Sequence, residues 1–211
     1  MWIECRSGGR FQLPALIETP LHFFKGRCAQ GGVGLGSGRG MAMLGGMILR
    51  VSAAFAKQFQ CEVSQPGAEL PQERRLDAWS CHFIRVRRKP LVVVMNDATL
   101  FTLILPATGV KGFPELWLKL LGRIGEVWTR HGVDFDQDNQ EVLLLSRTNR
   151  SLIGSMNDAI LLIRFYADDA WDERREFDLG EMEARSNQTP YKALGFERPE
   201  RLMAKALQGG V

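Results

Sequence analysis

The sequence predicts an α+β domain in which an antiparallel β meander of about four to five strands packs with helices, with a small helical tail at the C-terminus. Short apolar runs separated by turn residues lie between residues 79 and 105, a pattern typical of strands joined by tight turns. Apolar side chains at helical spacing follow between residues 113 and 132, which indicates an amphipathic helix packed on the sheet.

Residues 1–46 differ in composition from the rest of the chain. They contain 11 of the 22 glycines and the entire net charge of +3, so the remainder is neutral. They show neither strand alternation nor a helical stripe. We therefore expect a glycine-rich extension, or sequence upstream of a true start at Met47. The predicted divisions are the extension 1–46, a core domain 47–167 and a charged helical tail 168–211 packed on the core.

A regular spacing of apolar residues, typical of strands and helices, begins at Met47. Residues 48–51 predict a strand, and residues 53–60 a short amphipathic helix. A polar connection, 63–77, contains Pro66, Gly67 and Pro71.

Three strands are then predicted, at residues 79–86, 91–95 and 100–105. Arg87 to Pro90 and Asn96 to Thr99 have the composition of turns. The second and third strands are almost continuously apolar, so we expect packing on both faces of the sheet.

The helix between Phe113 and Gly132 has Pro114 in its first turn. Residues 141–146 predict a strand that is either the fourth of the meander or its neighbour. A helix over 151–166 follows, then a charged stretch, 168–183, and two short helices that begin after Pro190 and after Pro199.

The sequence gives no sign of a metal, a cofactor or a membrane span. The four cysteines form no C-x-x-C pair. The acidic loop that starts at Asp134 has Asn139 where a calcium loop needs glycine, and Leu145 where it needs glutamate. No apolar run approaches the roughly 20 residues of a transmembrane helix. We expect a cytoplasmic protein without metal or cofactor.

The candidate site is the turn into the helix that follows the strand at 141–146. Two arginines lie beside the helix N-terminus, where unpaired N–H groups already favour an anion such as a phosphate or a carboxylate. Ser151, Ser155 and Asp158 fall at spacings that predict one polar helix face. The predicted site consists of Arg147, Arg150, Ser151, Ser155, Asn157 and Asp158. The alternative is that Ser151 caps the helix and the arginines pair with Asp97 or Asp158.

Nucleophilic catalysis would need a serine or cysteine near a base, and the histidines are few. His131 ends a helix, and only His82 lies on a strand close to the predicted core. Its neighbour Cys81 points to the opposite face of that strand. A structural histidine is therefore the favoured interpretation.

Several short motifs resemble an uncharacterised family of bacterial domains of unknown function. They are Trp79 at the head of its strand, Arg87-Arg88-Lys89, Met95-Asn96-Asp97, Arg150-Ser151 and Gly154-Ser155-Met156-Asn157. The resemblance spans roughly residues 47–166. It implies no activity, because no activity is known for the family. Similar sequences often have histidine in place of Ser80 and asparagine in place of His82, which weakens any catalytic role for a histidine.

The leading functional hypothesis is a small non-catalytic binding or interaction module whose recognition surface is the turn from Arg147 to Asp158. Its partner would be another protein or a small anionic ligand, and the oligomeric state is left open. One alternative is a hydrolase or transferase that acts on a phosphate-containing small molecule or nucleotide. A third is a nucleic-acid-associated protein that uses the basic stretch 85–89. The neutral net charge of the core argues against this alternative, because a surface that binds a polyanion is normally basic.

Overall fold

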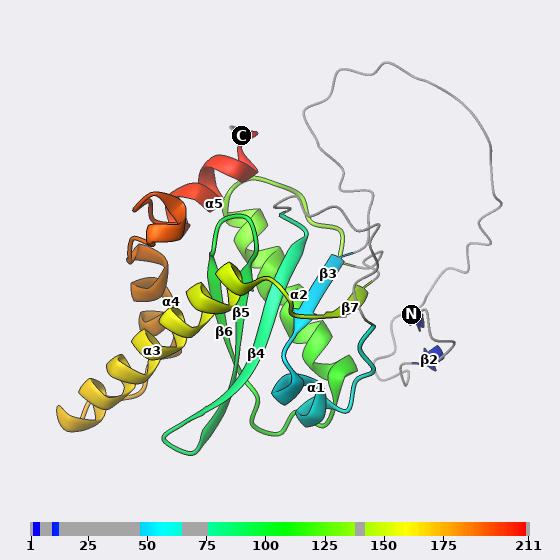
Figure 1. The fold of residues 1–211 in the computed structure, drawn as a ribbon, viewed down its shortest axis with the longest axis horizontal. Helices are drawn as coiled ribbons and strands as arrows, with labels where there is room; N and C mark the ends of the chain where they lie inside the picture. The colour runs from blue at the N-terminus through cyan, green and yellow to red at the C-terminus, as the bar shows by residue number, and fades with distance from the viewer. Residues whose placement is uncertain (1, 5–9, 13–46, 65–75, 138–141, 210–211) are drawn as a thin grey trace.

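The computed structural model describes residues 2–4, 10–12, 47–64, 76–137 and 142–209 (Figure 1). Its centre is a five-stranded sheet with the order β6-β5-β4-β3-β7. The strands are β3 (Met47–Val51), β4 (Ala78–Val86), β5 (Lys89–Asn96), β6 (Thr102–Pro106) and β7 (Val142–Ser146).

Two short strands, β1 (Trp2–Glu4) and β2 (Arg10–Gln12), form a separate antiparallel pair. The other residues of the predicted extension lie outside the described residues, and so does most of the predicted polar connection, residues 65–75.

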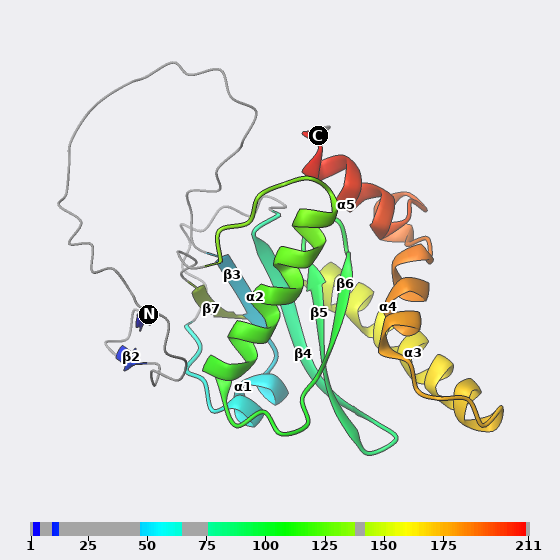
Figure 2. The same ribbon diagram turned by 180° about the vertical axis from the view of Figure 1, so that it is seen from behind.

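Helices cover both faces of the sheet. On one face lie α1 (Ala53–Phe59) and α2 (Phe113–Arg130), which Figure 2 shows in front of the strands. On the other lies α3 (Arg150–Asp172), in front of the strands in Figure 1, while α4 (Leu179–Gln188) lies beside β6 at the edge of the sheet. A 3-10 turn η1 (Lys192–Leu194) and α5 (Pro199–Leu207) complete the chain.

The sheet is mixed, so the prediction of an antiparallel meander is correct for only part of it. Strands β4, β5 and β6 form the predicted meander, but β3 pairs in parallel with both β4 and β7. The physical reason is the length of the connections. An antiparallel pair can be joined by a tight turn, whereas a helical crossover such as α2 returns the chain to the same end of the sheet.

Both faces of β5 are buried, as its continuous apolar sequence predicts. Val92 and Val94 join the cluster under α1 and α2, whereas Leu91, Val93 and Met95 join the cluster under α3 and α4. The predicted stripe of α2 packs in the first cluster, with Trp117 fully buried. Two layers of helix on one sheet therefore account for the core.

Side chains of α4 satisfy the outer edge of β6. Asn187 accepts a hydrogen bond from the backbone N–H of Thr102 at 2.7 Å and donates one to the carbonyl of the same residue at 2.8 Å. Glu183 accepts from the N–H of Ile104 at 2.9 Å and is itself paired with Arg123. These contacts occupy positions that another strand would use, and so protect the edge from pairing with a second chain.

The C-terminal part contains more helix than predicted. Helix α3 continues to Asp172, six residues beyond the predicted end, and α4 occupies part of a stretch that was expected only to be charged. The two short helices appear as η1 and α5. No helix in the described part of the chain is long and apolar enough to cross a membrane.

The substitution Asn187→Ala tests the protection of the β6 edge. It leaves the buried N–H and C=O of Thr102 without partners, and we expect it to lower the free energy of unfolding by roughly 2–4 kcal/mol. Gln188→Ala, at an exposed position one residue further along α4, is the control and should change little. Equal urea midpoints for the two variants would contradict the proposed role of Asn187.

Candidate functional site

The predicted site residues divide into buried and exposed groups. Arg147, directly after β7, is half-buried, and Ser155 is buried on α3. Arg150, Ser151, Asn157 and Asp158 are exposed. The spacing predicted that Ser155 shares a polar helix face with Ser151 and Asp158. This prediction is wrong for Ser155, which does not face solvent.

The cap of α3 is Asn149. Its side-chain oxygen accepts hydrogen bonds from the N–H groups of Ser151 and Leu152 at 3.0 and 3.3 Å. The alternative assignment of Ser151 as the cap is therefore wrong by two residues. Asparagine satisfies the first free N–H groups of a helix as well as serine does, so composition alone could not separate the two.

The carboxyl ends of β3 and β7 meet where the chain leaves the sheet toward opposite faces. After β3 it enters α1 on one face, and after β7 it passes to α3 on the other (Figures 1 and 2). In open α/β sheets, such a change of direction between adjacent parallel strands leaves a crevice in which ligands bind.

A row of three polar side chains crosses this end of the sheet. Arg50 is in register with Ser80 on β4 and with Leu145 on β7. Two residues further on, alternation places Ser52, His82 and Arg147 on the same face. The backbone continues the pairing, because the N–H of Ser52 bonds to β4 and that of Arg147 bonds to the carbonyl of Val51.

Ser52 and His82 are hydrogen-bonded, with 2.7 Å between Oγ and Nδ1. The same Oγ accepts from the N–H of Phe55 and thereby caps α1. Burial, together with the positive charges of Arg147 and Arg164, lowers the pKa of His82 from 6.5 to about 4. His82 is therefore a neutral imidazole at pH 7.

Arg147 is the unusual member of the row. Its Nε and Nη1 atoms are buried and have no hydrogen-bond partner among the residues that the structure describes. Burial lowers the pKa of its guanidinium group. Buried N–H donors without an acceptor are energetically costly, which makes this position the best candidate for binding an anion.

The buried carboxylate of Asp97 is paired with another arginine. Asp97, 3% exposed, is paired with Arg50 and accepts a hydrogen bond from the hydroxyl of Ser80 at 2.8 Å. Burial raises the pKa of Asp97, while the charge of Arg50 and the bond from Ser80 act in the opposite direction. The expectation that Asp97 pairs with Arg147 or Arg150 is therefore wrong, because Arg50 takes that place.

Sequence reasoning missed Ser52 and Arg164 as neighbours of His82. Ser52 stands between a strand and a helix, a visible capping signal, but its contact with His82 depends on strand register. Cys81 lies in the cluster on the α2 face, whereas His82 forms its bond with Ser52 on the other, so the two are not partners, as predicted.

One family of domains of unknown function, DUF6933, matches residues 48–202. The chain belongs to this family. The match extends beyond the range of the sequence resemblance and takes in α4 and the start of α5. No curated protein matches the chain, and no solved structure does.

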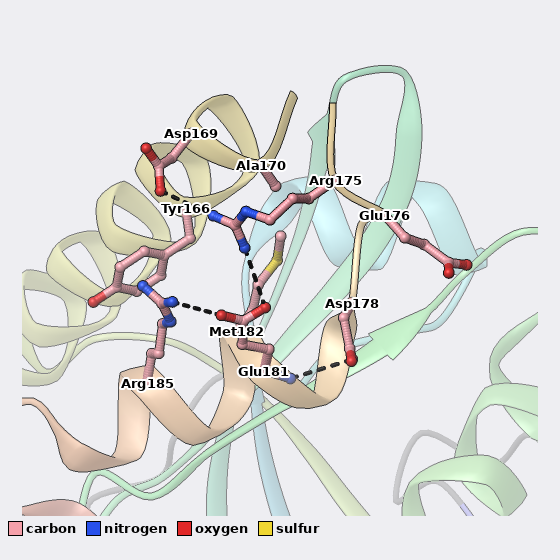
Figure 3. Close-up of a pocket in the computed structure, with 9 residues that line it drawn as sticks. All are labelled: Tyr166, Asp169, Ala170, Arg175, Glu176, Asp178, Glu181, Met182 and Arg185. Atoms are coloured by element: carbon pink, nitrogen blue, oxygen red, sulfur yellow. Dashed lines mark hydrogen bonds and ion pairs between the residues drawn. The ribbon is translucent and has the colours of Figure 1, made fainter. Parts of the chain in front are cut away.

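This DUF6933 domain has a hollow between α3 and α4 that ion pairs fill (Figure 3). Arg175 contacts Asp169 at 3.2 Å and Glu181 at 3.6 Å, and Glu181 also pairs with Arg185 at 2.5 Å. The remaining volume of about 10 Å³ is suited to a single water. The cluster links the two helices and leaves no room for a ligand.

In the described ranges, no group of three or more His, Cys, Asp or Glu side chains is placed to hold a metal ion. Residues 138–141 of the acidic loop that was compared with a calcium site lie outside those ranges.

The low pKa of His82 predicts a pH dependence. The unfolded chain binds a proton at His82 near pH 6.5, whereas the native state does so only near pH 4. Between these values the unfolded state binds more protons, so the free energy of unfolding should fall as the pH falls. Urea titrations and histidine NMR, with His82→Asn as reference, measure both effects. An imidazole midpoint above 6, or parallel stability profiles, would contradict the assignment.

Proposed function

We propose that this domain is a non-catalytic binding module for a small anionic ligand, held between the β3–α1 and β7–α3 turns with Arg147 as the pairing cation. The observation that carries the proposal is the buried guanidinium group of Arg147, two of whose nitrogens have no described partner. A phosphate or carboxylate would supply both the missing charge and the missing hydrogen-bond acceptors.

The surroundings of Arg147 support an anion rather than a cation. Ser52 and His82 are uncharged at pH 7 and can donate or accept hydrogen bonds. Arg164 is close enough for its charge to lower the pKa of His82. The buried carboxylate of Asp97 is paired with Arg50.

The first turn of α3 provides further candidates for contact. Arg150 and Ser151 are exposed there, beside the turn that carries Arg147. An anion larger than inorganic phosphate would extend toward them. Ser155, Asn157 and Asp158 lie further along the helix and have a smaller part in the proposal.

The Ser52 and His82 pair is the one observation that favours a hydrolase or transferase. A serine hydroxyl 2.7 Å from an imidazole nitrogen resembles a nucleophile with its base. However, a pKa of about 4 makes His82 a weak base, and a general base works best with a pKa near the working pH. Ser52 is also buried and engaged as the cap of α1. We therefore favour binding over catalysis.

Nucleic-acid binding through the basic hairpin has weaker support. Arg87 is paired with Asp168 at 2.8 Å and lies over the ring of Trp171, and Lys89 lies over the ring of Phe177. These cations are engaged within the domain. The free thiol of Cys81 and the family resemblance are compatible with a bacterial cytoplasmic protein.

The substitution Arg147→Met separates binding from a structural role. It keeps an apolar stem and removes a charge that is buried without a partner. We therefore expect the ligand-free variant to melt at the same temperature as the wild type or higher. It should lose the stabilisation by phosphate, dicarboxylates or nucleotides, which in the wild type should reach about 2.7 kcal/mol at 100 times the dissociation constant.

Two variants serve as controls for this experiment. Lys119→Met, on the solvent side of α2, should keep the ligand effect. Arg123→Met should lower the melting temperature, because it leaves the mostly buried Glu183 without its cation. If Arg147→Met destabilises the fold as Arg123→Met does, or if no anion shifts the wild-type melting temperature, the proposal is wrong.

A further inference from the structure

One side of α3 exposes three large apolar side chains. Leu161, Phe165 and Trp171 are 67%, 65% and 65% exposed. At 3.6 residues per turn, they share an arc of about 120° with Arg164 and Asp168, which are also exposed. We call these five residues the α3 face. Such a concentration of exposed apolar area on one helix marks an interaction surface.

The α3 face is complementary to a second copy of itself. If two copies of α3 pack antiparallel about a two-fold axis near Tyr166, a residue i lies opposite a residue near 332 − i. Leu161 then meets the partner's Trp171, Arg164 meets the partner's Asp168, and Phe165 lies close to the axis. Each of the three apolar side chains gains an apolar neighbour, and Arg164 and Asp168 each gain an opposite charge, twice over by symmetry.

We propose that the α3 face is the interface of a homodimer. This inference does not depend on Arg147, the cation that carries the proposed function, and the two share only Arg164. A membrane surface fits the face poorly, since Asp168 and Asp172 lie among its apolar side chains and would be repelled by anionic lipids. A second copy covers the apolar side chains and pairs Arg164 with Asp168.

The β4–β5 hairpin holds part of the face in place. Arg87 at its tip donates to Asp168 at 2.8 Å, and its guanidinium carbon lies 5.3 Å from the centre of the Trp171 ring. In Figure 1 the hairpin lies beside the C-terminal half of α3, beyond the body of the sheet. Side chains that are ordered before association lose less entropy on binding.

Charge reversal at the paired positions tests this geometry directly. Arg164→Asp and Asp168→Arg should each weaken the dimer at least tenfold in sedimentation velocity, because each homodimer contains two like-charge contacts. A mixture of the two variants should restore the dimer. In the mixed pair, one contact joins the two reversed residues and the other joins the two natural ones, so both attract.

Apolar variants complete the test. Phe165→Ser should give a folded monomer, while Phe196→Ser, at an equally exposed aromatic outside the face, should leave the dimer intact. Circular dichroism checks that each variant is folded. A wild-type chain that remains monomeric at millimolar concentration would overturn the inference, as would a dimer insensitive to Phe165→Ser or a mixture that fails to associate.

Discussion

The position of β3 between two parallel neighbours is the constraint on which the rest of the structure depends. Because β3 pairs with β4 on one side and with β7 on the other, the register that buries Leu49 also aligns Ser52, His82 and Arg147 at one end of the sheet. A shift of one residue would turn every side chain of a strand to the other face. After β3 and β7 the chain enters helices on opposite faces of the sheet, α1 and α3.

Much of the fold could be predicted from the sequence because it depends on local pattern. The period of α2, the apolar run of β5 and the turn residues between β4 and β5 identified elements that the structure confirms. Strand partners could not be predicted in this way. An apolar run such as β7 indicates burial on both faces but does not indicate which strand lies beside it. The parallel pairing of β7 with β3 was therefore not predicted. Helix α4 was missed because its charged sequence hides the three buried residues that fix it: Met182, Ser186 and Asn187.

The candidate site was predicted only in part, because it too depends on which strands are neighbours. Arg147 follows a predicted strand and precedes a predicted helix, so its place at the sheet edge could be inferred from order along the chain. Its neighbours could not, since Ser52 and His82 are 95 and 65 positions away in the sequence. The alternative partner, Asp97, is excluded by Arg50, a strand residue whose orientation toward the carboxylate depends on register. Polar contacts between strands that are distant in the sequence therefore could not be predicted.

The proposed anion binding depends on one side chain, Arg147, and NMR of the arginine side chains tests it most directly. In a protein labelled with ¹⁵N, the Nε–H resonance of Arg147, assigned by its loss in Arg147→Met, should move in a saturable manner as phosphate or a small carboxylate is added at pH 7. The resonance of Arg123, which is already paired with Glu183, should stay in place. A resonance of Arg147 that does not respond to any anion, while the fold remains intact, would contradict the claim that this guanidinium group binds an anionic ligand.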